Sequence, residues 1–156
     1  MSGRYAEQTA VPSEKSRAEI ERTLTRYGAE AFQYGWTAGR AVIGFVAIGR
    51  QIRFELPLPD RASDEFTLTP TGRVRTVAMA EKEYEQAVRQ RWRALSLMVK
   101  AKLEAVQAEI VAFEDEFLPH TVMPDGRTVA QQIGPAVEHA YATGAVAPLR
   151  ITAGGS

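Results

Sequence analysis

The fold of this chain is decided by residues 29–58, which read AEAFQYGWTAGRAVIGFVAIGRQIRFELPL. Residues 29–37 and 51–58 alternate between apolar and polar side chains, as strands with one buried face do. Residues 41–48 between them are apolar and rich in β-branched side chains. Short glycine-containing segments separate the three runs, and this order predicts a three-stranded antiparallel meander.

The register of the meander can be tested by assuming a two-residue loop at each turn. Ala38-Gly39 serves as the first loop and Gly49-Arg50 as the second. The facing pairs are then Trp36–Ala41, Tyr34–Ile43, Phe32–Phe45, Ala47–Ile52, Phe45–Phe54 and Ile43–Leu56. All these side chains fall on one face of the sheet, and a slip of one residue would send them to the other. We expect one aromatic-rich core face and a flatter opposite face.

One helix is expected before the meander in sequence and another after it. Ser16 and Glu19 have the spacing of a capping box, and Gly28 sits where a helix of about three turns would end. Apolar residues recur every three or four positions over residues 77–117, which predicts one long amphipathic helix lying across the core face. A break near residues 93–96 is the alternative. The fold class is therefore α+β.

The rest of the chain divides into loops, a last helix and two tails. Residues 61–72 are expected to form a polar loop, and Pro124-Asp125-Gly126 has the residues of a tight turn between short β segments. A C-terminal helix is predicted over residues 129–143, interrupted or restarted at Gly134-Pro135. We expect a single domain over residues 16–144, with a flexible arm before it (1–15) and a flexible tail after it (145–156).

Composition excludes several classes of protein. The 156 residues include no cysteine, so disulfides and thiolate metal sites are ruled out, and a reducing cytoplasm is the expected location. The longest apolar run, residues 41–48, is too short to cross a bilayer, and no signal peptide is recognisable. The formal net charge is zero, so uniform attraction of the whole surface to nucleic acid is not expected.

Charge is nevertheless unevenly distributed along the predicted long helix. Residues 73–102 hold eight basic and three acidic side chains, whereas residues 103–117 hold five acidic and no basic ones. A basic surface of this kind can contact phosphates, with Tyr84 or Trp92 available for base stacking. The candidate nucleic-acid-binding residues are Arg89, Arg91, Arg93, Lys100 and Lys102, with Arg50 and Arg53 from the sheet. The alternative is an ordinary solvated helix face.

Other candidate chemistry is weaker. Phe32, Tyr34 and Trp36 have the spacing of a stacking platform, but the predicted register puts them on the core face. His120 and His139 have no metal-ligand spacing, and no glycine motif for phosphate binding is present. We expect no catalytic residue, no metal and no cofactor.

Several motifs resemble a group of small, uncharacterised bacterial and prophage proteins. They cover roughly residues 15–150 and include Tyr34-Gly35-Trp36, the strand RFELPLP at 53–59, the run EQAVRQRWRALSLMVKAKLEAV at 85–106 and PDGRTV at 124–129. This resemblance implies a phage or mobile-element setting and no site residues. The order of a helix, a three-stranded meander and a long basic helix is also similar to the core of phage single-strand annealing proteins, which is a likeness of architecture alone.

The expected function is that of a nucleic-acid-associated accessory module, with single-stranded DNA as the partner. The alternative is a protein-interaction or self-assembling module without catalytic activity, because the long apolar stripe exceeds what a small sheet can cover. Antiparallel pairing of two long helices would then set basic against acidic segments, giving a homo-oligomer.

Overall fold

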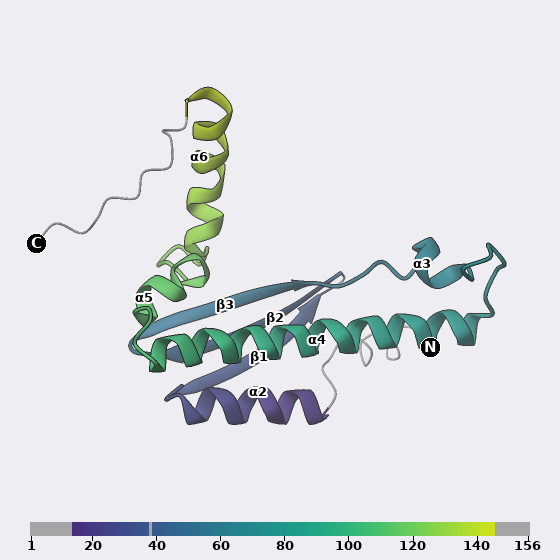
Figure 1. The fold of residues 1–156 in the computed structure, drawn as a ribbon, viewed down its shortest axis with the longest axis horizontal. Coiled ribbons are helices and arrows are strands. Elements are labelled where there is room, and N and C mark those ends of the chain that lie inside the picture. The colour runs from purple at the N-terminus through teal and green to yellow at the C-terminus, as the bar shows by residue number, and fades with distance from the viewer. Residues whose placement is uncertain (1–13, 38, 146–156) are drawn as a thin grey trace, which may run out of the picture.

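The computed structural model describes residues 14–37 and 39–145, and it has the mixed α+β architecture that the sequence predicts (Figure 1). The elements in chain order are α2 (Glu14–Arg26), β1 (Ala31–Thr37), β2 (Arg40–Ala47), β3 (Arg50–Pro57), α3 (Asp64–Thr67), α4 (Val77–Gln107), α5 (Phe113–Glu116), the short 3-10 helix η1 (Leu118–His120) and α6 (Val129–Thr143). Most of the predicted arm and of the tail lie outside the described residues, but Glu14 and Lys15, which were predicted to belong to the arm, are the first residues of α2.

The first hairpin has the predicted register. Trp36 faces Ala41, Tyr34 faces Ile43 and Phe32 faces Phe45, in a sheet of strand order β1-β2-β3. The pairs place Ala41, Ile43, Phe45 and Ala47 of β2 on the core face, where they are almost fully buried. Alternation of polarity selects the core face, and a two-residue turn between Thr37 and Arg40 selects the register within it.

The predicted register of the second hairpin is wrong by two residues. Phe45 faces Ile52 rather than Phe54, because the loop consists of Ile48-Gly49 and not Gly49-Arg50. Both loop residues have positive φ, 51° at Ile48 and 69° at Gly49, which is the backbone of a type I′ turn. A shift of two residues keeps every side chain on its predicted face, so the core face is unchanged.

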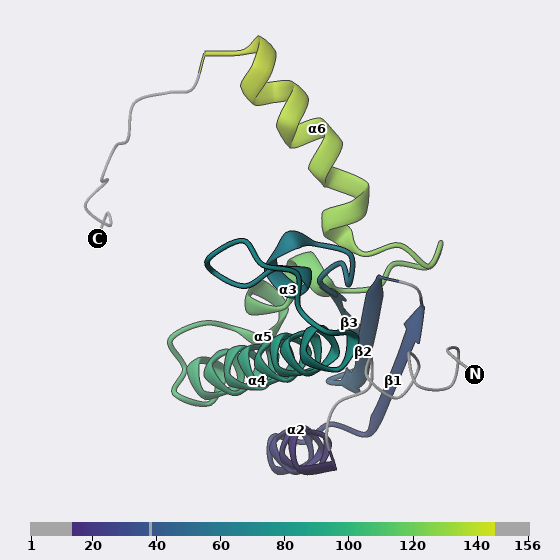
Figure 2. The same cartoon turned by 90° about the vertical axis from the view of Figure 1, so that its right-hand side faces the viewer.

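The core lies between the sheet and α4, with α2 beside α4 (Figure 2). Trp92 and Val88 from α4 and Ile20 and Leu24 from α2 are almost completely buried there. The core is closed at one end by Phe117, which meets the ring of Phe45 edge-on at 5.7 Å between centroids. The apolar stripe of the long helix is thus largely covered within the chain itself.

The long helix is continuous through residues 93–96 but ends at Gln107, ten residues before the predicted end. The Ile110 amide donates to the Ala105 carbonyl and the Glu109 amide to the Val106 carbonyl, while Glu109 adopts a positive φ of 60°. These bonds form a Schellman motif, which usually has glycine at the position of Glu109. The sequence therefore lacked the expected stop signal. Phe113 and Phe117 continue the stripe from the separate turn α5 and from the residue after it.

The segment between β3 and α4 is more ordered than the predicted polar loop. Ser63 caps the short helix α3, and Leu68 forms an isolated bridge with Val74. Phe66 of α3 packs edge-on against Tyr84 of α4, with 5.6 Å between ring centroids. This segment covers the part of α4 that extends beyond the sheet (Figure 1).

The C-terminal part begins with the predicted turn and continues as a single helix. The Gly126 amide donates to the Met123 carbonyl, and Val122 bridges to Thr128 across the turn. The α6 helix is continuous through Pro135. It projects away from the rest of the molecule in both views (Figures 1 and 2). Among the described residues, no helix has the length and apolar character needed to cross a membrane.

Candidate functional site

The α4 helix has one exposed flank on each side of its buried apolar stripe. On one flank, Arg91 Nη1 donates to the Pro57 carbonyl of β3 over 2.9 Å, and Lys102 Nζ lies 3.0 Å from Glu116 Oε1 of α5. This flank therefore faces β3 and α5. Lys102 is half-buried and already neutralised by Glu116, which makes it a poor partner for a phosphate.

The opposite flank carries Arg89, Arg93 and Lys100. Spacings of four and seven residues bring these three side chains into one row along the helix. Since β3 lies beside the other flank, this row lies on the side of β1 and α2. All three residues are exposed.

The neighbouring helix α2 adds two arginines that sequence reasoning missed. Arg22 and Arg26 lie one turn apart on its exposed surface, and Arg26 shares a shallow pocket with Leu103 and Gln107 of α4. More than sixty residues separate them from Arg89, so only the side-by-side packing of α2 and α4 reveals the grouping (Figure 1). We call the set Arg22, Arg26, Arg89, Arg93 and Lys100 the basic seam.

The charges of the basic seam are not neutralised by any carboxylate of residues 14–37 and 39–145. Within the part of the chain that the structure describes, none of its five side chains forms an ion pair. Glu19 precedes Arg22 by three residues on α2 but is not within ion-pair distance of it. Five unpaired cations on two adjacent helices can bind several phosphates of one chain.

The other predicted binding residues lie elsewhere. Arg53 is on the outer face of the sheet, where its Nε is 3.7 Å from Glu55 Oε1 and its Nη2 donates to Gln131 Oε1. Arg50 begins β3 and is 3.5 Å from Glu114. The structure therefore unites three of the seven predicted residues, Arg89, Arg93 and Lys100, and separates the rest.

An aromatic row follows β1 on the side of α2. The ring centroids of Phe32 and Tyr34 are 6.2 Å apart, and those of Tyr34 and Trp36 are 6.4 Å apart and nearly parallel. The row is on the core face, as predicted, but its end is open, because the Trp36 residue is 40% exposed. Arg17 Nη1 donates to the Tyr34 hydroxyl, and its guanidinium lies 5.0 Å from the centre of that ring.

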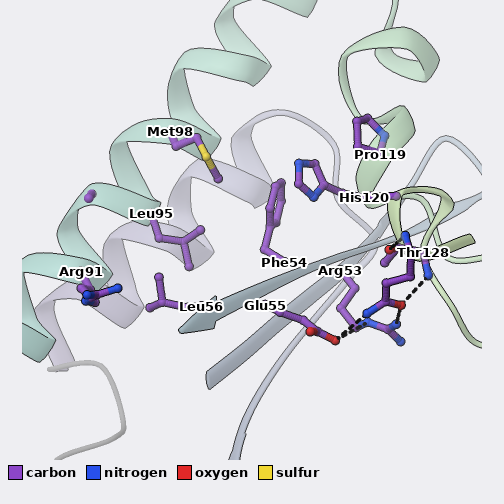
Figure 3. Close-up of a pocket in the computed structure, with 13 residues that line it drawn as sticks. Arg53, Phe54, Glu55, Leu56, Arg91, Leu95, Met98, Pro119, His120 and Thr128 are labelled. Carbon is purple, nitrogen blue, oxygen red and sulfur yellow. Dashed lines mark hydrogen bonds and ion pairs between the residues drawn. The ribbon is translucent and has the colours of Figure 1, made fainter. Parts of the chain in front are cut away.

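An apolar groove lies between α4 and β3, on the flank opposite the basic seam (Figure 3). Its volume is about 520 Å³, and its walls include Phe54, Leu56, Leu95 and Met98. The first residues of α6 form one rim. No sequence signal indicated this groove, because its walls come from four separate elements, β3, α4, η1 and α6.

The two histidines lie in different surroundings on separate elements. His120 lines the groove with its ring 4.2 Å from that of Phe54, whereas His139 is exposed on α6. Burial, and then the charge of Lys102, lower the pKa of His120, and Glu116 opposes them. The described residues contain no group of three side chains that could hold a metal ion.

Comparisons with protein-family models, with curated proteins and with solved structures found no match to this chain. Its function must therefore be argued from the basic seam, the aromatic row and the groove.

Proposed function

We propose that this protein is a nucleic-acid-associated accessory module that binds single-stranded DNA through the basic seam. The observation that carries the proposal is the grouping of five exposed cations, from α2 and α4, without a carboxylate partner among the described residues. The resemblance to prophage proteins is consistent with a role in phage or mobile-element DNA metabolism.

The zero net charge of the chain is compatible with this proposal because the opposite charges are separated in space. Glu114, Asp115 and Glu116 lie together on α5, and two of them pair with basic residues outside the seam. Phosphates at the seam would displace counterions from α2 and α4 without meeting these carboxylates. Binding would then be local and sensitive to salt.

The aromatic row supports a preference for single strands. Trp36 offers an exposed indole at the end of a stacked series, and Arg17 holds Tyr34 in place. Unpaired bases can stack on such a surface, whereas bases within a duplex cannot reach it. The row is in contact with α2, the helix that also carries Arg22 and Arg26, because Arg17 of α2 donates to the Tyr34 hydroxyl.

The proposal can be tested by titrating labelled single-stranded and duplex oligonucleotides and following fluorescence anisotropy. The test variant is the triple substitution Arg89→Ala, Arg93→Ala and Lys100→Ala. We expect it to weaken single-strand binding by about tenfold or more at low salt. The matched control is Arg50→Ala, Arg73→Ala and Arg127→Ala, which removes the same charge outside the seam.

Wild-type protein that binds neither kind of oligonucleotide at low salt would refute the proposal. An equal loss of single-strand affinity in the two triple variants would show that the overall charge of the protein, and not the seam, attracts the DNA. Duplex binding as tight as single-strand binding would remove the role of the aromatic row.

A protein-interaction or self-assembling module is the second candidate. The apolar stripe of the long helix no longer supports an interaction with another subunit, because Tyr84, Trp92 and Leu103 are buried in the chain's own core. A different observation now favours it, namely the uncovered helix α6.

A further inference from the structure

The α6 helix has no buried residue along its 15 positions. Ile133, Val137 and Tyr141 are 52%, 48% and 67% exposed. Their spacing of four residues places them on one face, so α6 presents an apolar ridge to solvent. The helix stands away from the body of the molecule (Figure 2).

Such a helix is not expected to persist without a covering surface. Isolated helices of this length are marginal in water, and α6 also contains Gly134 and Pro135 in its interior. Pro135 removes one backbone hydrogen bond, and Gly134 increases the entropy lost on ordering. Burial of the ridge would supply the missing stabilisation.

The ridge continues directly from the apolar groove. Ala130 lines the groove, and Ile133 follows it on the same side of α6. One apolar surface therefore runs from Phe54 and Met98, across the start of α6, and along the ridge. Surfaces of this extent mark interaction sites.

The ridge cannot fold back into the groove of its own chain. Thr128 and Gln131 form a capping box that fixes the first turn of α6. Gln131 is also tied to the sheet, since its Oε1 accepts from Arg53 and its Nε2 donates to Glu55. These bonds hold the start of α6 on the sheet, and the helix projects away from the rest of the molecule (Figures 1 and 2).

We propose that the α6 ridge of one copy docks in the apolar groove of a second copy, and that two copies do so reciprocally. The surface is self-complementary, because the groove and the ridge adjoin each other on each chain, as an isologous dimer requires. The arrangement would bury Ile133, Val137 and Tyr141 against Leu56, Leu95 and Met98 of the other copy.

Charge complementarity favours a second copy as the occupant. The α6 helix has one carboxylate, Glu138, and no lysine or arginine. The groove rim has Arg91, whose guanidinium donates to the Pro57 carbonyl. Among the described residues, neither Glu138 nor Arg91 has an ion-pair partner, so each can meet the other across the dimer.

The first test is the mass of the full chain by light scattering at tens of micromolar. We expect twice the 17.2 kDa of one chain. Val137→Ser with Tyr141→Ser should give the single-chain mass, with the core still folded by circular dichroism because α6 does not contribute to it. Ala142→Ser, on the opposite side of the same helix, should remain dimeric.

The second test exchanges the charges. Glu138→Arg and Arg91→Glu should each raise the dimer dissociation constant by about fivefold, and the two together should restore it. A wild-type monomer, dissociation by Ala142→Ser as complete as by the ridge variant, or failure of the double exchange to restore the dimer would each overturn the proposal. A wild-type monomer would assign the groove to another partner.

Discussion

Among the residues that the structure describes, two non-glycine residues adopt a left-handed backbone, and both lie where sequence reasoning placed a boundary wrongly. Ile48 occupies the first position of the second hairpin loop, and Glu109 follows the C-terminus of α4. Turn rules look for glycine or asparagine at such positions. Neither site could be recognised, because the pairing of β2 with β3 and the packing of Phe113 and Phe117 impose these conformations from outside the turn.

Replacing Ile48 with asparagine is expected to stabilise the protein by about 1 kcal/mol. A β-branched residue is strained at φ 51°, whereas asparagine tolerates this region, and Ile48 is 63% exposed and loses little burial. Urea denaturation of the full chain measures the change. Ile110→Asn, which replaces another exposed isoleucine where φ is not positive, is the control, and an equal gain there would contradict the strain argument.

Protonation of His120 is expected to destabilise the folded protein. Its pKa is lowered in the folded state, first by burial and then by Lys102, so the unfolded chain binds the proton more readily. Stability contributed by neutral His120 is present above the unfolded pKa near 6.5 and is lost as pH falls through the lower folded pKa. The free energy of unfolding should therefore decrease from pH 7 to pH 5.

The His120→Gln variant should show a shallower decrease over the same interval. His139→Gln, which removes the exposed histidine on α6, should retain the wild-type dependence. Urea denaturation at four or five pH values gives both curves. Parallel curves for wild type and His120→Gln would assign the pH dependence to other groups.

Among the elements, α4 was predicted well at its start, Val77, and through its middle, but poorly at its C-terminal end. Its buried stripe, Tyr84 to Leu103, follows directly from the spacing of apolar residues. Its excess length over the sheet suggested a partner subunit, but α3 and the segment around it cover the extra turns. Phe66, the one large apolar residue of the predicted polar loop, was the signal for that packing.

The capping box at Thr128 is expected to hold the start of α6. The Thr128 hydroxyl accepts from the Gln131 amide over 3.2 Å, and the Thr128 amide donates to Gln131 Oε1 over 2.9 Å. Thr128→Ala should destabilise the first turn by about 1 kcal/mol, which is about a fivefold increase in local opening. Amide hydrogen exchange of residues 130–134 measures it.

Thr143→Ala, at the other end of the same helix, is the matched control for Thr128→Ala. Its hydroxyl donates to the His139 carbonyl and caps no free amide. Equal exchange of residues 130–134 in both variants would show that the capping box does not hold α6.

At the scale of the whole molecule, the sequence indicated which helix carries positive charge. It did not indicate on which side of that helix the basic side chains are exposed and without ion-pair partners. Arg89 and Arg91 are two residues apart, yet one belongs to the basic seam and the other to the groove. Arg22 and Arg26 joined the seam only through tertiary packing. Pairing of Lys102 with Glu116 and Arg50 with Glu114 depends on α5, whose position could not be predicted.

The seam makes a quantitative prediction about salt. Each phosphate contact contributes about 0.7 to the slope of log binding constant against log salt for single strands. Removal of Arg89, Arg93 and Lys100 should lower that slope by about 2, whereas the Arg50, Arg73 and Arg127 control should leave it unchanged. Anisotropy titrations across a salt series give the slopes. A weaker variant with an unchanged slope would mean that these residues do not contact phosphates.

The meander also has a consequence for how the chain is made. All pairing in the sheet is between strands that are consecutive in sequence, so the sheet can form locally once Pro57 has left the ribosome. Its core face, with Ile43, Phe45 and Phe54, stays uncovered until α4 has been synthesised. During that interval the nascent chain exposes an aromatic surface, and we expect chaperone binding to be greatest there.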